Sequence, residues 1–133
     1  ELQELIIKET IPVVSPLSKE SSSGHTLNTN ADLAASALAG TMHVAKLVYI
    51  SDVLGVMRDP DDDGSLIHSI CCSEVEPLAD EGVISGGMLP KLRSAVDAIS
   101  SGVGKVHLID GRIPHSLLLE IFTNTGVGTE IVP

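Results

Sequence analysis

Apolar residues along the chain form two kinds of segment that alternate. Mostly apolar runs are typical of strands buried on both faces of a sheet, and we expect strands at 11–14, 46–50, 106–109 and 130–132. Apolar or small residues that recur on one face indicate helices, expected at 2–6, 31–42, 74–80, 92–99 and 114–122. The alternation predicts an α/β fold, a three-layer α/β/α sandwich with a mainly parallel sheet. The run 47–50 should lie in the sheet interior.

Polar residues mark where several elements begin. Asn30 is a good N-cap for the helix at 31–42, and Ser73 with Glu76 has the spacing of a capping box. The tract 15–24 is interpreted as a loop. The acidic stretch 58–64 resembles the first half of a calcium loop, but Ile70 stands where the last ligand should be, so we interpret it as a solvated turn.

The stretch 83–91 reads Val-Ile-Ser-Gly-Gly-Met-Leu-Pro-Lys. Gly86 and Gly87 allow a tight turn, Pro90 suits the first turn of a helix, and Lys91 sits near the start of that helix. Backbone amides and a lysine that converge at a helix N-terminus make a phosphate site. The simpler interpretation, favoured on this stretch alone, is an ordinary turn that caps a surface helix.

Two further features are compatible with phosphate chemistry. A polar loop with a glycine, beginning Ser51-Asp52, directly follows the apolar run 46–50, which is where open α/β sheets place ligands. Asp32 lies at a helix start, where it either favours the helix dipole or holds Lys91 in place during phosphoryl transfer. There is no P-loop, no Gly-x-Ser-x-Gly elbow and no sign of a catalytic triad. His107, on an apolar strand, is on its own more typical of a core or interface histidine.

Composition narrows the class of protein. The 133 residues are 43% apolar, which is enough for one domain with a core, and only 2% are aromatic. The net charge of −10 argues against nucleic acid or an anionic membrane as the partner. No apolar run is long enough to cross a bilayer, and no metal-ligand spacing occurs. Cys71 and Cys72 are adjacent, so they are poor disulfide partners and suit a reducing compartment.

Four ordered blocks resemble a known family, and the resemblance extends over almost all 133 residues. The segments 27–32, 51–56 and 83–91 are similar to the C-terminal, nucleotide-binding half of the acetylglutamate kinases, in the amino acid kinase superfamily with its carbamate kinase-like fold. The tail 105–129 is similar to the arginine-regulated members. Ser51 stands where threonine is more usual, which keeps the hydroxyl.

The resemblance implies phosphoryl transfer from ATP to the side-chain carboxylate of N-acetyl-L-glutamate, a step of arginine biosynthesis. Asn28 would hold the acetylglutamate, Asp32 would organise the catalytic lysines, and Lys91 would stabilise the moving phosphoryl group. Mg²⁺ would be bound with the ATP phosphates rather than in a protein cage. The nucleotide would be lined by two loops, made of Asp52, Val53, Leu54, Gly55, Val56 and Met57, and of Val83, Ile84 and Ser85.

The resemblance also implies regulation and assembly. His107, Glu120 and Gly126 would belong to a site for L-arginine, the feedback inhibitor. A homo-oligomer is implied, hexameric in arginine-sensitive relatives, with a PII-type signalling protein as partner if the source is a plant, alga or cyanobacterium. The implied location is the cytoplasm, or a plastid in a photosynthetic eukaryote.

The chain departs from the family pattern in one respect. The glycine-rich phosphate loop, a first catalytic lysine and most of the acceptor pocket belong to the family's N-terminal half, and they have no counterpart here. We therefore interpret residues 1–133 as the C-terminal ATP-binding portion and expect them to be inactive alone. The alternatives are a kinase for another acid, such as aspartate, glutamate or carbamate, and a non-catalytic module that binds ATP or arginine.

Overall fold

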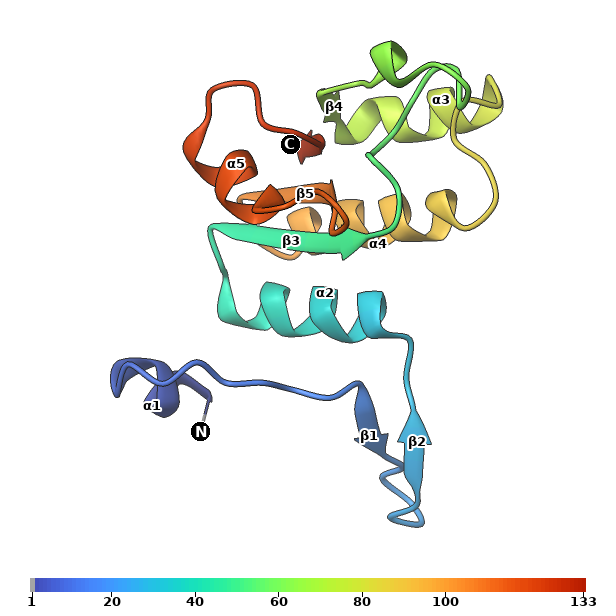
Figure 1. Ribbon diagram of the computed structural model, residues 1–133. Helices are drawn as coiled ribbons and strands as arrows, with labels where there is room; N and C mark the ends of the chain where they lie inside the picture. Colours follow the sequence, from blue (N-terminus) through green and yellow to red (C-terminus); the bar gives the residue numbers. More distant parts are fainter. Residues whose placement is uncertain (1) are drawn as a thin grey trace.

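A mixed sheet organises residues 2–133, which are the residues that the computed structural model describes (Figure 1). Within them, four strands lie side by side in the order β3 (Lys46–Ser51), β5 (Lys105–Asp110), β6 (Thr129–Val132) and β4 (Ser69–Cys71). β3 pairs with β5, and β4 with β6, in parallel, whereas β5 and β6 are antiparallel. The prediction of a mainly parallel sheet is confirmed, but β4 and the antiparallel pair were not anticipated.

Helices cover the sheet on both sides, as the three-layer prediction requires. Helices α2 (Ala31–Met42), α3 (Val75–Asp80) and α4 (Met88–Ser100) lie on one face, and α5 (Ser116–Phe122) lies on the other (Figure 1). Strand β5 shows the alternation directly. Val106 and Leu108 belong to the core with Leu92 of α4, whereas His107 between them bonds Glu120 of α5. Successive side chains of a strand point to opposite faces.

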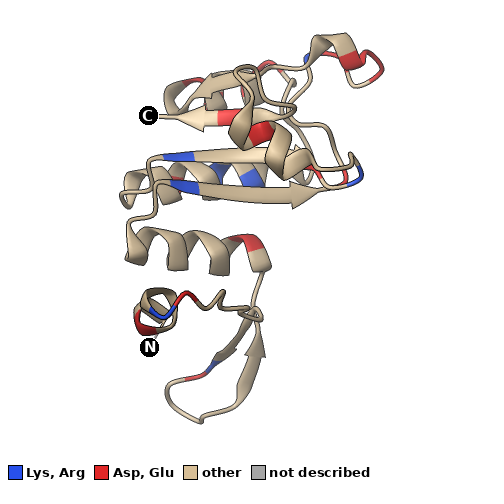
Figure 2. Cartoon of the chain, turned by 60° about the vertical axis from the view of Figure 1, so that its left-hand side comes forward, with Lys and Arg blue, Asp and Glu red and all other residues tan. Residues whose placement is uncertain are grey.

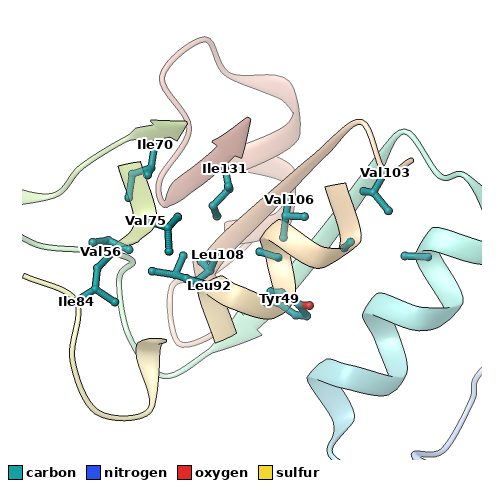
Figure 3. Packing of buried hydrophobic residues seen from close by; sticks show 13 residues of the cluster. Tyr49, Val56, Ile70, Val75, Ile84, Leu92, Val103, Val106, Leu108 and Ile131 are labelled. Carbon is teal, nitrogen blue, oxygen red and sulfur yellow. The ribbon is translucent and has the colours of Figure 1, made fainter. Parts of the chain in front are cut away.

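The core between the sheet and α4 is almost entirely aliphatic (Figure 3). Tyr49 is its one aromatic member among the described residues, and its side chain brings a hydroxyl into an apolar layer. Each fully buried leucine or isoleucine contributes about 1.5–3 kcal/mol relative to exposure. The most deeply buried large side chains are Val56, Ile70, Val75, Leu92, Val106, Leu108, Ile109, Thr129 and Ile131.

The expectation that 47–50 lies in the sheet interior is wrong. β3 is at the edge of the sheet, and no other strand among residues 2–133 pairs with its second side. Tyr49 is buried under the helices, but Ile50, on the opposite face, is 59% exposed. An apolar run indicates burial of a strand's faces and carries no information on the hydrogen-bond partners at its two edges.

The N-terminal part departs most from the sequence prediction. The helix expected at 2–6 is confirmed as α1 (Leu2–Ile7), while Glu1 lies outside the described residues. The strand expected at 11–14 is wrong: this segment is irregular, and Ile11 and Val13 are 88% and 95% exposed. Pro12 interrupts the run and has no N–H to donate to a ladder. Within the tract 15–24, expected as a loop, Leu17–Lys19 instead forms strand β1, which pairs with β2 (Thr26–Asn28) in a hairpin; residues 20–24 lie in the turn between them.

Helix starts follow the sequence signals in part. Asn30 caps α2 as predicted, because its Oδ1 accepts a hydrogen bond from the Leu33 amide at 3.1 Å. The predicted capping box of Ser73 and Glu76 is wrong. The chain begins to turn two residues earlier, in the 3₁₀ turn Cys72–Glu74, where the Cys71 amide donates to Glu74 Oε2 at 2.7 Å. Glu76 instead bonds Arg93 of α4 through both carboxylate oxygens at 2.8 Å.

The acidic stretch forms an exposed turn ending in the 3₁₀ segment Asp63–Ser65, in which Asp62 accepts from the Gly64 amide at 2.9 Å. In Figure 2, acidic residues colour part of this turn red, and basic residues colour the starts of β3 and β5 blue. Within residues 2–133, no group of three or more His, Cys, Asp or Glu side chains is arranged to hold a metal ion. None of the helices described is both long and apolar enough to cross a membrane.

Candidate functional site

The start of α2 and the start of α4 meet at one edge of the sheet, where β3 and β5 end. Each helix precedes one of these parallel strands and returns along it, so its N-terminus lies at the strand's carboxyl end. Asp32 and Lys91 are the polar side chains of these two helix starts. Lys91 Nζ lies 2.6 Å from Asp32 Oδ2, and the side chains are 18% and 31% exposed. The predicted pairing of this lysine with this carboxylate is confirmed.

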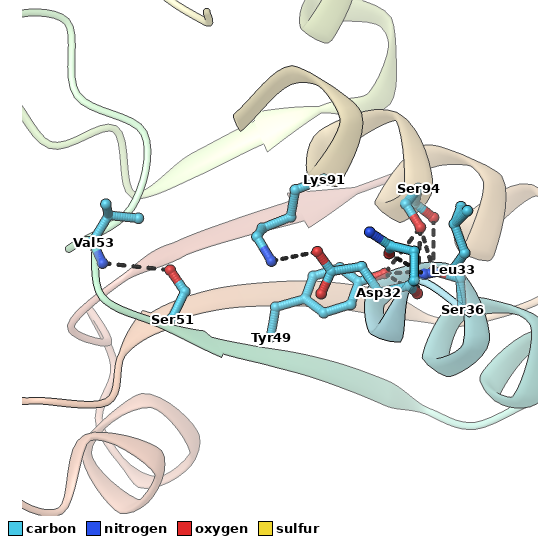
Figure 4. A network of polar contacts seen from close by, with 9 residues as sticks. Asp32, Leu33, Ser36, Tyr49, Ser51, Val53, Lys91 and Ser94 are labelled. Carbon is cyan, nitrogen blue, oxygen red and sulfur yellow. Dashed lines mark hydrogen bonds and ion pairs between the residues drawn. The ribbon is translucent and has the colours of Figure 1, made fainter. Parts of the chain in front are cut away.

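Sequence reasoning missed a third member of this cluster. The Tyr49 ring, on β3, lies with its centroid 5.0 Å from Lys91 Nζ. Its hydroxyl belongs to a polar network with Ser36 and Ser94, which joins β3 to both helices (Figure 4). The available signal was a single tyrosine within an otherwise aliphatic strand.

The loop after β3 is held by the core at one end. Gly55 and Val56 are buried, and the Val56 amide donates to Thr129 Oγ1 on β6 at 2.9 Å. Only glycine fits at Gly55, because its φ is 154° and an added Cβ would lie 2.5 Å from Thr129 Oγ1. Asp52 and Val53 are exposed, and Leu54 and Met57 are half-buried. The glycine of this motif therefore has a structural role, and the exposed Asp52 and Val53 are the members free to meet a ligand.

The second loop predicted to line a nucleotide converges with the first. Ile84 is buried and lies close to Val56 in the core (Figure 3), Val83 is half-buried, and Ser85 is exposed. Beyond it, the turn at Gly86 and Gly87 is open: an added Cβ there would meet no described atom within 4 Å. The two loops thus meet in the core at Val56 and Ile84, and the second of them leads into the α4 N-terminus that carries Lys91.

Asn28, the predicted acetylglutamate residue, ends β2 and is exposed, four positions before Asp32. A pocket of about 280 Å³ lies over the starts of the two helices. Its lining includes the ion pair and the glycine turn: Asn30, Asp32, Leu33, Gly87, Pro90, Lys91 and Ser94.

The predicted regulatory residues form a separate cluster on the opposite face of β5. His107 Nδ1 lies 2.6 Å from Glu120 Oε1, and both side chains are 4% exposed. Glu120 Oε2 accepts hydrogen bonds from the Val127 and Gly128 amides at 2.7 and 3.1 Å. Gly126 has a φ of 65°, and a Cβ there would lie 2.5 Å from Glu120 Oε2. His107, Glu120 and Gly126 are therefore brought together, as the sequence resemblance implied.

Burial raises the pKa of Glu120, but the hydrogen bonds from His107 and from the Val127 and Gly128 amides outweigh it, so its pKa is lowered overall. His107 Nε2 is buried and has no hydrogen-bond partner among the described residues. His107 is among the residues that line a cleft of about 440 Å³. The charged residues of this cleft include Lys46, Lys105 and Glu130; Lys105 Nζ and Glu130 Oε2 are 2.8 Å apart. Lys46 and Lys105 begin their strands, so this cleft lies at the end of the strands opposite to the Lys91 cluster.

Comparison with known protein families shows to which family the chain belongs. The sequence model of the amino acid kinase family matches residues 1–110. The chain belongs to the amino acid kinase family. Among curated members, it is 53% identical over 131 residues to the acetylglutamate kinase of Akkermansia muciniphila, covering 98% of this chain and 44% of that protein. It is 51% identical over 132 residues to the acetylglutamate kinase of Methanobrevibacter smithii, covering 98% and 45%. The chain thus spans less than half the length of these relatives.

Solved structures of related proteins agree with this amino acid kinase assignment. N-acetylglutamate synthase from Neisseria gonorrhoeae, complexed with coenzyme A and N-acetyl-glutamate, superposes with a TM-score of 0.89 at 31% identity, over 99% of this chain and 30% of that one. Carbamate kinase from Giardia gives a TM-score of 0.74 at 24% identity, over 98% and 46%. The second comparison shows the fold alone, and it confirms the carbamate kinase-like prediction.

Proposed function

We propose that this amino acid kinase chain is the nucleotide-binding part of an acetylglutamate kinase, which transfers the terminal phosphoryl group of ATP to the side-chain carboxylate of N-acetyl-L-glutamate. The observation that carries the proposal is the Lys91–Asp32 pair, 2.6 Å apart at the edge where the two loops converge. The identity of 53% to a kinase of that name supports the choice of substrate.

In this proposal each residue has one task. Lys91 neutralises negative charge as the phosphoryl group moves, and Asp32 holds the ammonium at the required point. The amides at the open Gly86–Gly87 turn face the phosphates from the start of α4. Mg²⁺, when bound, would neutralise further phosphate charge. It would be bound with the ATP phosphates rather than in a cage of protein carboxylates.

In this proposal Asn28 binds the acceptor, N-acetyl-L-glutamate. It is exposed at the end of β2, four positions before Asp32. An amide side chain can both donate to and accept from the substrate, which suits an acylated amino acid. The same chemistry on a different acid would make the chain part of an aspartate, glutamate or carbamate kinase.

The test is ADP release from Mg-ATP with the chain alone and with the chain plus the N-terminal half of the Akkermansia muciniphila kinase. We expect no turnover from the chain alone, because within its described residues Lys91 is the one lysine at the site. With the added half, N-acetylglutamate should release ADP, whereas aspartate, glutamate and carbamate should not. Turnover by the chain alone, or release with another acid, would contradict the proposal.

We also propose that the cleft beside His107 and Glu120 binds L-arginine as a feedback inhibitor. Partly exposed Glu130 offers a carboxylate to a guanidinium, and the lysines at the strand starts suit a carboxylate. A related synthase from Neisseria gonorrhoeae has been solved with coenzyme A and L-arginine. Homo-oligomer formation, a PII-type partner and a cytoplasmic location remain implications of the sequence resemblance. Calorimetry should detect binding of arginine but not of citrulline, which lacks the charge, and equal binding of both would overturn the proposed site.

A further inference from the structure

Tyr49 occupies an unusual place for a core residue, because its ring faces a charged group. It is 4% exposed and packs beneath α2 and α4. The Lys91 ammonium lies 5.0 Å from the ring centroid, within the reach of about 6 Å over which a cation is attracted to an aromatic face. Asp32 bonds the same ammonium at 2.6 Å. Lys91 is thus held by a carboxylate from α2 and by a ring from β3.

The hydroxyl of Tyr49 fixes the ring in turn. It bonds Ser36 Oγ, donates to the Asp32 carbonyl at 3.3 Å and lies 3.3 Å from Ser94 Oγ. Ser36 and Ser94 are 2.7 Å apart through their hydroxyls. Ser36 lies one turn after Asp32 on α2, and Ser94 lies one turn after Lys91 on α4. The two helices that carry the ion pair are therefore joined to β3 one turn further along.

The hydroxyl groups of this network all have hydrogen-bond partners and lie in the core, so the network can hold the Tyr49 ring in one position. Ser36 and Ser94 are 7% and 3% exposed. Each of the three hydroxyl groups has a partner within the network: Ser94 bonds Ser36, Ser36 bonds Tyr49, and Tyr49 donates to the Asp32 carbonyl. A fully satisfied polar network in a core rigidifies its members. A general packing role for Tyr49 would need the ring but none of these bonds.

We propose that Tyr49 is a positioning residue, which fixes the Lys91 ammonium at the carboxyl end of β3 through its ring and fixes its own ring through the Ser36–Ser94 network. The catalytic part of this proposal rests on the proposed kinase function; the placement of Lys91 does not. Figure 4 shows the arrangement: Lys91 extends between Asp32 and the end of β3 at Ser51, with the Tyr49 ring alongside. Without the ring, Asp32 alone holds the ammonium, which can then swing about a single contact.

The first test is NMR of the chain, which needs no kinase activity. The protons on Lys91 Cε should resonate upfield of those of the other lysines, because the Nζ atom bonded to this carbon lies over the ring. Tyr49→Leu should return them to the ordinary range, while Tyr49→Phe, which keeps the ring but loses the bonds that fix it, should leave a smaller upfield shift. The control Val106→Ala opens the core on β5, away from Lys91, and should not move them. An unchanged Lys91 signal in Tyr49→Leu would overturn the proposal.

The second test is kinetic, in the kinase reconstituted with the N-terminal half. A misplacement of about 1 Å at a reacting centre costs about 100-fold, so Tyr49→Leu should lower kcat about 100-fold with little change in the KM for ATP. Tyr49→Phe, which loses one hydroxyl, should lower kcat about tenfold or less. If Tyr49→Leu does not fold, Ser94→Ala decides instead: it should lower kcat and shift the Lys91 signal, and no change in either would defeat the proposal. If the parent shows no kinase activity but the NMR result holds, the proposed function fails and the placement stands.

Discussion

Lys91→Ala should lower kcat about 100- to 1,000-fold in the reconstituted kinase, a loss of roughly 3–4 kcal/mol of transition-state stabilisation. Its ammonium is fixed by Asp32 at 2.6 Å and by the Tyr49 ring before any substrate arrives. A charge held in place in this way needs no reorganisation as the phosphoryl group moves. The KM for ATP should change much less than kcat, because the charge acts mainly as the transition state forms.

Arg93→Ala is the matched control for Lys91→Ala. Arg93 lies two residues further on the same helix and carries the same charge, but it points away to the exposed Glu76. Its removal should leave kcat within about twofold, because exposed ion pairs contribute little. Steady-state rates over a range of ATP concentrations separate kcat from KM for each variant. Equal losses of kcat in the two variants would contradict the assignment of Lys91, and so would an unchanged kcat in Lys91→Ala.

Glu120→Ala should destabilise the fold by about 3–5 kcal/mol, which is the cost expected when one partner of a buried pair is removed. Both carboxylate oxygens are used: one bonds His107 and the other accepts from the Val127 and Gly128 amides. The change would leave the Gly128 amide and one imidazole nitrogen buried without their partner, and the half-buried Val127 amide would lose its partner too. Urea unfolding monitored by circular dichroism measures the loss.

Glu130→Ala is the control for Glu120→Ala. Glu130 also pairs with a basic residue, but the Lys105–Glu130 pair is partly exposed, at 39% and 30%, so its loss should cost about 1 kcal/mol or less. A loss as small as this for Glu120→Ala would show that the pair with His107 does not hold α5 on the sheet.

The stability that Glu120 provides should depend on pH in one direction. Its pKa in the folded chain lies below the ordinary value of 4.5, so the folded state binds the proton less readily than the unfolded state. The contribution is therefore complete above pH 4.5 and is lost as the pH falls through the folded pKa. Unfolding experiments from neutral to acid pH should show this loss in the parent and a smaller one in Glu120→Gln.

The sequence could predict those parts of the site that depend on residue type and local order. Asn30 caps α2, and the helix that carries Lys91 begins at the glycine turn, because both depend on neighbouring residues. The order of helices and strands then placed Asp32 and Lys91 at the same edge, since each helix returns along a parallel strand. The pair was therefore within reach of sequence reasoning.

The missed features depend on contacts between distant parts of the chain. The role of Tyr49 arises from Ser36 and Ser94, which are 13 and 45 positions away. Likewise, Gly55 is explained by Thr129 on β6, and the edge position of β3 follows from strand pairing rather than from its apolar run. The pattern of neighbouring residues in the sequence carries no information on such contacts.

The most direct measurement of the central claim is an NMR titration of the chain with ADP and with Mg-ATP. If the convergent loops and the α4 N-terminus form a nucleotide site, the amides of Asp52, Val53, Ser85, Gly86 and Gly87 should shift first. The amides of the acidic turn 59–64, which lies outside the proposed site, should stay unchanged. Shifts confined to that turn, or no shifts at millimolar nucleotide, would contradict the account.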